Sequence, residues 1–203
     1  MLSYILVVNF IGSFVLGTRT ADIAAEINDG SIINDLLKPI SFFRYWFAYD
    51  LSDKFINFVF ALVEFVLIIL IFKINLVSLS NFLPAILFFI NGTLISFFIN
   101  IMLSFVGFWT TEVWAPRFIF LNLVFFLSGS FFPLDVIPAS IYKILLLTPF
   151  PYLVYFPTTI LLGKIPTFWI GFFGISSLWV LTTAMVALFI WKRGNKSFSF
   201  WGR

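Results

Sequence analysis

Five long apolar runs are the feature that most constrains what this chain can fold into. A soluble domain of 203 residues could not bury them, because 62% of the residues are hydrophobic and only 10% are charged. Each run approaches the roughly 20 residues that a helix needs to cross a bilayer. We expect spans at about residues 2–17, 55–72, 82–108, 113–132 and 168–191.

The fold class follows from the backbone. In lipid, only helices and closed barrels satisfy every backbone polar group, and the alternating pattern of barrel strands is not seen in this sequence. The sequence therefore predicts an all-α integral membrane protein with five transmembrane helices. We find no internal repeat or linker, so residues 1–203 are expected to form a single transmembrane domain.

The residue types that the chain lacks exclude several chemistries. The sequence has no Cys and no His, which excludes disulfides, thiol nucleophiles and most zinc or redox-metal sites. Its one Gly-Lys pair, Gly163-Lys164, is followed by Ile165, and Thr158 stands where a phosphate-binding loop has its first glycine. We therefore expect no catalytic, metal-binding or cofactor-binding residues. The net charge of +3 gives no reason to expect nucleic acid as a partner.

Positive charge predicts the orientation in the membrane. Of the 12 Lys and Arg residues, nine lie in segment 18–54, at Arg117 or after Trp191. The positive-inside rule places these regions in the cytoplasm, with Arg117 snorkelling to the interface. Four spans separate segment 18–54 from the basic tail 192–203, so both can face the same side. The N-terminus would then lie outside.

The segment 133–167 is apolar but repeatedly interrupted by proline, which breaks or starts short helices. A further crossing here would put the basic tail on the outer side. We therefore expect an extracellular re-entrant helical hairpin in the outer leaflet before the last span. The alternative is that residues 141–162 form a sixth, kinked span, because the charge rule has exceptions.

The cytoplasmic segment contains the stretch "AAEINDGSIINDLLKPISFFRYW", which starts at Ala24. Ser31 can cap a short helix and Pro39 can stop it. The apolar positions of this helix form one stripe and are Ile32, Ile33, Leu36 and Leu37. The polar positions on the other side are Asn34, Asp35 and Lys38. Such a helix either lies on the membrane surface or inserts into a groove of a partner protein. The acidic residues of the segment weigh against a purely lipid-binding role.

Polar residues within or beside the spans have two interpretations each. Glu64 lies in the middle of a predicted span. It is either a residue of the pathway or of a helix contact, or a protonated glutamic acid with no role beyond packing. Asn91 and Asn100 are expected to donate interhelical hydrogen bonds. Glu112 either contacts a partner or inner gate, or is a solvated residue at the interface.

The stretch "EINDGSIINDLLKPIS", followed by a span, resembles the cytoplasmic coupling segment of type-2 ATP-binding-cassette (ABC) exporter permeases. The resemblance is greatest to a small bacterial family often described as viologen-exporter-like. The stretch "GFWTTEVWAPRFIFLNLVFFLSGSFFPLDVIPASIYKILLLTPFPYLVYFPTTILLGK" is similar to the second half of the same family. The match runs from about Tyr4 to Phe200.

The resemblance implies a permease subunit in the bacterial cytoplasmic membrane, in contact with membrane lipid. Two such subunits, identical or different, would form a pathway driven by a separate dimer of ABC ATPase subunits, which would bind the ATP and Mg²⁺. The ATPase-coupling residues that it implies are Glu26, Gly30, Ile32, Ile33, Leu36, Leu37, Lys38 and Pro39. The pathway or gate residues that it implies are Glu64, Trp109, Glu112, Gly129, Pro133, Asp135, Pro149 and Pro151.

The family has six spans where this sequence has five, so we expect the first span of the family fold to be missing. An accessory or inactive subunit without its own pathway is therefore a rival interpretation. A membrane-embedded lipid-modifying enzyme is a second rival, although such an enzyme needs clustered acids, bases or metal ligands near an interface.

Overall fold

The computed structural model describes residues 2–73 and 81–197, so Arg203 of the predicted basic tail lies outside the described residues. Within these ranges the chain is helical and has no strand, which confirms the all-helical class. The α-helices are α1 (Leu2–Val15), α2 (Asp22–Asp29), α3 (Ile32–Leu36), α4 (Phe42–Phe72), α5 (Phe82–Phe105), α6 (Trp114–Leu127), α7 (Ala139–Leu145), α8 (Tyr155–Leu161) and α9 (Trp169–Ser197). The 3₁₀-helices are η2 (Val106–Phe108), η3 (Leu134–Val136) and η4 (Phe150–Tyr152).

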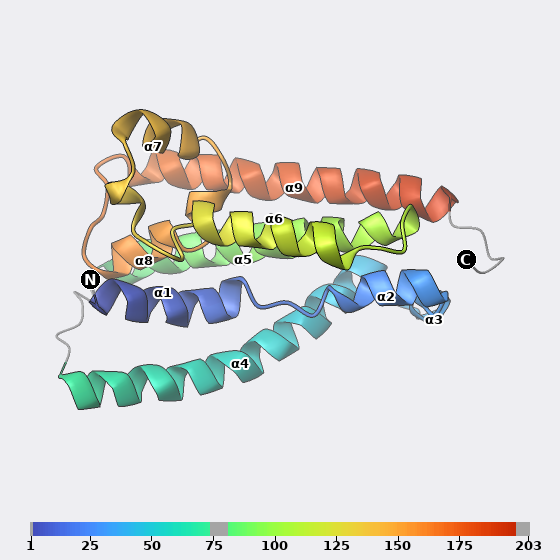
Figure 1. The fold of residues 1–203 in the computed structure, drawn as a ribbon, viewed down its shortest axis with the longest axis horizontal. Coiled ribbons are helices and arrows are strands. Elements are labelled where there is room, and N and C mark those ends of the chain that lie inside the picture. The colour runs from blue at the N-terminus through green and yellow to red at the C-terminus, as the bar shows by residue number, and fades with distance from the viewer. Residues whose placement is uncertain (1, 74–80, 198–203) are drawn as a thin grey trace.

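Among the described residues, three helices are long and apolar enough to cross a membrane, and they span Phe42–Phe72, Phe82–Phe108 and Trp169–Lys196. The other two predicted spans are shorter apolar helices, α1 and α6, with 14 residues each. A helix of that length is about 21 Å long. Figure 1 shows α1 and α6 alongside the long helices. The membrane class is thus confirmed, and the count of five spans stays a prediction.

Helix α4 begins at Phe42, thirteen residues before the span expected at 55–72, so residues 42–54 of the predicted cytoplasmic loop 18–54 are helical. The reason is a buried stripe on the first turns of the helix. Its buried residues are Phe42, Trp46, Asp50 and Lys54, and their spacing of four places them on one helix face. Hydropathy alone did not reveal this part of the helix because two of the four residues are charged.

One end of the bundle, here called the basic end, holds α2, α3, the start of α4, residues 106–113 and the end of α9 (Figure 1). An apolar cluster that includes Ile23, Ile32 and Phe105 fills it. Phe42 stacks on Trp191 with ring centroids 4.1 Å apart. Segment 18–41 and the end of α9 therefore lie at the same end, in agreement with the charge pattern.

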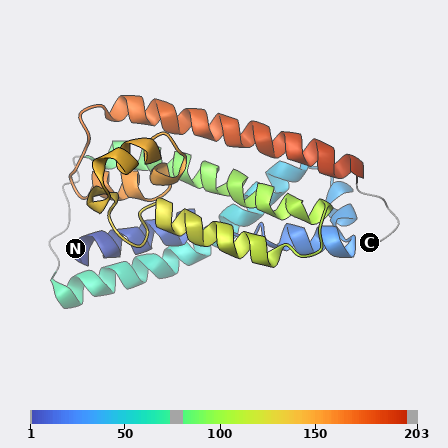
Figure 2. The same ribbon diagram turned by 45° about the horizontal axis from the view of Figure 1, so that its top comes forward.

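The opposite end, here called the proline end, holds residues 128–168. Its α-helices, α7 and α8, have seven residues each, about 10 Å. Figure 2 shows this segment gathered at the end where α9 begins. Phe88 of α5 stacks on Phe156 of α8, with centroids 5.2 Å apart. The segment thus leaves α6 and enters α9 at the same end, and within 141–162 no helix is long enough to cross a bilayer.

Candidate functional site

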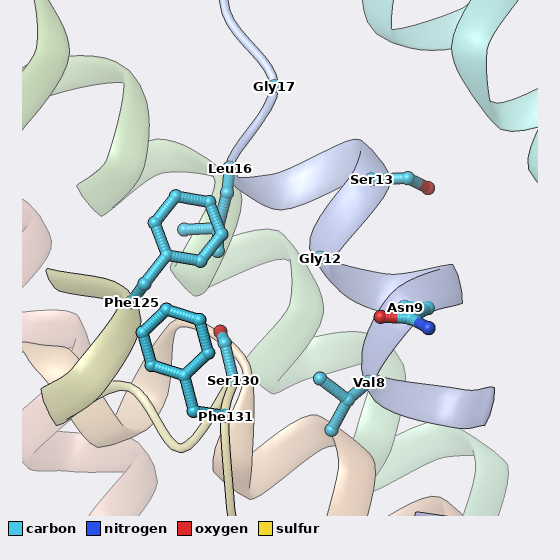
Figure 3. Close-up of a pocket in the computed structure, with 9 residues that line it drawn as sticks. All are labelled: Val8, Asn9, Gly12, Ser13, Leu16, Gly17, Phe125, Ser130 and Phe131. Carbon is cyan, nitrogen blue, oxygen red and sulfur yellow. The ribbon is translucent and has the colours of Figure 1, made fainter. Parts of the chain in front are cut away.

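A cleft of about 390 Å³ lies between α1 and the end of α6 (Figure 3). It is lined by Val8, Asn9, Gly12, Ser13, Leu16, Gly17, Phe125, Ser130 and Phe131. Val8 and Leu16 point toward the two phenyl rings, whereas Asn9 and Ser13 lie on the side of α1 nearer α4. The cleft exists because the α1 residues opposite the rings include the small Gly12 and Gly17. An apolar wall with a few hydroxyl and amide groups at its edge suits an amphipathic molecule.

The cleft narrows toward the basic end. A second cavity of about 30 Å³ follows it, and Leu16 and Phe125 line both. A cavity of this size has room for water but not for a large molecule. Asn100 of α5 also lines the small cavity, deep in the bundle. The side chains of Leu16 and Phe125 therefore form a constriction.

A third cavity, of about 290 Å³, lies at the basic end between α2, residues 111–113 and the start of α6. Its lining includes Ala25 and Asn28 from α2 and Trp114 and Arg117 from α6. Asn28 Nδ2 donates to the Thr111 carbonyl oxygen at 3.1 Å, which ties α2 to the loop before α6. The three cavities together follow the seam between α1–α2 and α6 from the basic end to the middle of the bundle.

Arg117 does not snorkel to the interface, and that prediction was wrong. Its side chain is 8% exposed and turns inward to α5. The guanidinium donates to Ser104 Oγ at 2.8 Å, to Asn100 Oδ1 at 3.0 Å and to the Asn100 carbonyl oxygen at 3.4 Å. The acceptors stand four residues apart on α5, so one helix face presents both to Arg117.

The two predicted interhelical asparagines face different neighbours. Asn91 donates to Ser176 Oγ at 2.9 Å and to Ser177 Oγ at 3.0 Å, which links α5 to α9. Asn100 instead faces α6 and accepts from Arg117. The prediction that Asn91 donates an interhelical hydrogen bond is confirmed. Asn100 joins helices mainly as an acceptor, since its own amide nitrogen donates within α5 to Ser96.

The predicted coupling helix is shorter than expected, and the apolar residues of its predicted stripe do not all have the same exposure. Ile32 is buried, whereas Leu36 and Leu37 are exposed, Leu37 by 78%. Asp35, predicted on the solvent side, is buried. Both differences arise because α3 has five residues and packs its first turn against the bundle, so one stripe cannot continue to Leu37. Ile33 is half-buried and Pro39 is exposed after the helix end.

Contrary to the prediction, Ser31 does not cap α3 with its side chain. Its Oγ bonds Asp29 Oδ1 at 2.6 Å instead. Asp29 lies at the end of the preceding helix, α2, which was not predicted from the sequence. Two features of the sequence could have revealed α2: the spacing of four residues between Ile23 and Ile27, and the glycine at position 30. In the structure both isoleucines are buried, and Gly30 ends the helix in a left-handed conformation with φ +82°. Gly30, assigned above to ATPase coupling, thus has a local conformational role.

A carboxyl pair lies between α2 and α3. Glu26 Oε2 and Asp35 Oδ2 are buried without a hydrogen-bond partner among the described residues. Burial, and next the negative charge of Asp35, raise the pKa of Glu26 to about 7. Lys38 Nζ donates to Asp35 Oδ1 at 2.7 Å, and this contact raises the pKa of Lys38. The predicted coupling residues Glu26 and Lys38 therefore act on the same carboxylate.

A buried ion pair holds the end of α1 against α4. Lys54 Nζ donates to the carbonyl oxygens of Phe14 at 2.9 Å and Val15 at 3.2 Å, and also to that of Gly17. Asp50 Oδ2 lies 3.5 Å from the same nitrogen. Asp50 Oδ1 accepts from the backbone N–H of Arg19 at 2.9 Å. Lys54 is one of the basic residues from which the orientation was predicted, and in the structure it caps the carbonyl end of α1.

The predicted pathway residues lie in three separate places. Glu64 borders a cavity of about 50 Å³ between α1 and α4, with its side chain on the outer surface of the subunit. Trp109 and Glu112 are exposed at the basic end. The remaining members of the set lie at the proline end and are Gly129, Pro133, Asp135, Pro149 and Pro151.

At the proline end, two contacts join distant parts of the chain. Tyr4 Oη donates to the Gly129 carbonyl oxygen at 2.7 Å, which ties α1 to the end of α6. Asp135 accepts from the Tyr155 hydroxyl, and its Oδ2 lies 3.5 Å from Lys164 Nζ. Pro149 and Pro151 are buried, and Pro133 is partly buried. Gly129 itself has φ +80°, a conformation that favours glycine.

Comparison with known proteins gives one match. The family described as ABC-2 family transporter protein matches residues 1–202. No curated protein and no solved structure matches the chain significantly. The match extends over nearly the whole sequence, and the apolar helices are those of a membrane protein. The chain therefore belongs to the ABC-2 family of transporter proteins and is the membrane subunit, or permease, of a transporter.

Proposed function

We propose that this permease forms half of the translocation pathway of an ATP-driven exporter in a bacterial cytoplasmic membrane. The observation that carries the proposal is the row of cavities along the seam between α1–α2 and α6. Cargo would enter at the basic end, beside Trp114 and Arg117. The constriction at Leu16 and Phe125 would then have to open before cargo could reach the large cleft.

A second permease subunit would complete the pathway. The large cleft opens to the side of the subunit, and Asn9 at its edge is exposed. Glu64 is exposed close by. Polar and ionisable groups in contact with lipid are costly, so a protein partner or a water-filled pathway is the favourable neighbour for both. The apolar side chains of α4 that face outward, such as Phe60 and Ile71, would contact lipid.

The basic end offers a surface for the ATPase. Leu36, Leu37 and Ile40 are exposed apolar side chains on a polar segment, where they would insert into a groove of the partner. The ATPase would supply the nucleotide and Mg²⁺ sites, and this chain would bind neither.

A series of contacts can carry movement of α3 to the seam. Helix α2 directly precedes α3 and packs closely against η2. The approach is so close that a Cβ added to Gly107 of η2 would lie 3.4 Å from the Ala24 carbonyl oxygen of α2. Before α2, the Thr20 carbonyl oxygen accepts from Ser104 Oγ at 2.6 Å. Ser104 in turn accepts from Arg117 of α6. Displacement of α2 would therefore act on α6, through Ser104 of α5, at the entrance of the pathway.

Replacing both Leu36 and Leu37 with Asp is expected to abolish co-purification with the ATPase and leave membrane insertion unchanged. Both side chains are exposed, so charge there should not disturb the fold of the subunit. Pull-down of the tagged permease from membranes measures the retained ATPase. Val136→Asp, at a 75% exposed position of the proline end, is the control and should retain it. Undiminished co-purification of the double variant would reject the coupling surface.

The proposed orientation can be tested by labelling, because the chain has no native cysteine. Val136→Cys should react with a membrane-impermeant maleimide added to intact cells, since the proline end would face outward. Lys196→Cys should react only after the membrane is opened. Equal reaction of both cysteines in intact cells would contradict the shared cytoplasmic position of segment 18–41 and the tail, and with it the re-entrant hairpin.

A further inference from the structure

The cavity at the basic end has a buried cation in its wall. Arg117 contributes a charged side chain that is only 8% exposed, and its hydrogen-bond partners, Asn100 and Ser104, are neutral. Among the described residues, no carboxylate lies within ion-pair distance of this guanidinium. A buried charge without a counter-charge is costly, which makes the site receptive to an anion.

The guanidinium also has donors to spare. An arginine side chain has five N–H donors in a planar fork. Three hydrogen bonds go to Asn100 and Ser104, so two N–H groups have no acceptor among the described residues. The fork matches the geometry of a carboxylate or phosphate. Arg117 is also one of the residues that line the cavity, so a group bound there would lie close to this side chain.

The acidic groups around the cavity do not cancel this charge. Asp22 and Asp50 act on Arg117 only from beyond ion-pair distance. Asp50 is already held by Lys54 and by the Thr18 hydroxyl at 2.7 Å. Asp22 and Glu112 are exposed, so water screens their charges. The buried part of the cavity wall therefore carries positive charge.

An apolar surface continues from the guanidinium along α6. Trp114 at the rim of the cavity stacks on Phe118, with ring centroids 5.2 Å apart, and both are exposed. Further along α6, Leu121, Val124 and Phe125 line the narrow part of the seam. A molecule held by its charged end at Arg117 could thus lay an apolar body along this helix.

We propose that the basic-end cavity binds an amphipathic anion, with its carboxylate or phosphate on Arg117 and its apolar part along α6. The proposal deepens the proposed function, on which it rests, by naming the class of cargo. The same chemistry has two sources: an anionic lipid of the adjacent leaflet, or an exported amphiphile.

The first test uses the full chain in a non-ionic detergent. Ala25→Cys places the only cysteine at an exposed position of the cavity wall. Dodecyl phosphate should slow its reaction with a maleimide, and dodecyltrimethylammonium at the same concentration should not. Equal protection by both would overturn the proposal. The proposal would also be overturned if only dodecyltrimethylammonium protected the cysteine and the Glu112→Gln substitution abolished that protection.

The second test asks whether Arg117 is the anion-binding group. Arg117→Gln keeps an amide donor for Asn100 but removes the charge. It should weaken dodecyl phosphate protection about tenfold or more, as expected for loss of a charge-assisted hydrogen bond. Arg44→Gln removes an exposed arginine near the same end and should leave protection unchanged. Thermal unfolding of each variant checks its fold. Unchanged protection in a folded Arg117→Gln protein would overturn the proposal.

The assembled transporter separates the two sources. Stimulation of ATP hydrolysis by dodecyl phosphate would support an exported amphiphile, whereas retention of phosphatidylglycerol over phosphatidylcholine, without stimulation, would support a resident lipid. Failure of the proposed exporter function can be distinguished from failure of the anion-binding site. Binding to the isolated chain that depends on Arg117, in a protein that captures no ATPase, would leave the site standing and reject only the exporter role.

Discussion

Lys54→Met is expected to destabilise the folded protein strongly. The substitution keeps an aliphatic side chain but leaves Asp50 buried without its cation and the carbonyl oxygens at the end of α1 without a donor. Removing one partner of a buried ion pair costs about 3–5 kcal/mol. That is a large part of the roughly 5–15 kcal/mol by which a typical domain is stable. Thermal unfolding in detergent, followed by tryptophan fluorescence, measures the loss.

The matched control removes a cation from an exposed pair close by. Arg19 Nε lies 2.9 Å from Asp53 Oδ1, and the arginine side chain is 52% exposed. Arg19→Met should leave the unfolding temperature almost unchanged, because water screens the pair. Adding Asp50→Asn to Lys54→Met should recover part of the lost stability, since the buried negative charge is then removed. If Arg19→Met and Lys54→Met lowered the unfolding temperature equally, the structural role of Lys54 would be rejected.

Gly92→Ala is expected to prevent close packing of the proline-end segment on α5. A Cβ at Gly92 would lie 2.8 Å from the Leu153 carbonyl oxygen and 2.9 Å from that of Tyr152. Both contacts are with backbone, so relief requires a shift of η4 and α8 rather than a side-chain rotation. Overpacking of this kind costs about 1–3 kcal/mol. Over most of this range the cost exceeds the roughly 1 kcal/mol that alanine gains over glycine within a helix.

Hydrogen exchange in residues 149–162 and thermal unfolding together measure the effect of Gly92→Ala. Faster exchange there and a lower unfolding temperature are expected. Gly174→Ala is the control, because a Cβ at this α9 position has no atom within 4 Å and the replacement should be neutral or stabilising. A Gly92→Ala protein as stable as the control would show that α8 does not depend on this close approach.

The sequence predicted well those features that depend on local composition. The helix Phe82–Phe108 coincides with a predicted span, and the last span was predicted within a residue at its start, because each is a continuous apolar run. The shared end of segment 18–41 and α9 also followed from charge alone. The start of α4 could not be predicted from hydropathy, since Asp50 and Lys54 make its buried face polar.

The candidate site was predicted only in part. Leu36 and Leu37 are exposed as a docking surface requires, but Asp35 faces inward toward Glu26, and Ile32 belongs to the core. The cleft between α1 and α6 was not foreseen. Its lining comes from residues 8–17 and 125–131, more than a hundred positions apart, and none of its side chains has a chemistry that distinguishes it in a sequence.

The sequence by itself determined that this chain is a helical membrane protein, where two of its three long described helices begin, and which of its segments share an end. Hydropathy and charge act on each helix separately through lipid and water, so no knowledge of neighbours is needed. Only the tertiary structure decided that Arg117 turns inward, that Lys54 caps α1 and that α1 and α6 leave a cleft between them. The free energy of a buried charge depends on acceptors such as Asn100 and the carbonyl oxygens at the end of α1, and the fold alone brings those acceptors within hydrogen-bond distance.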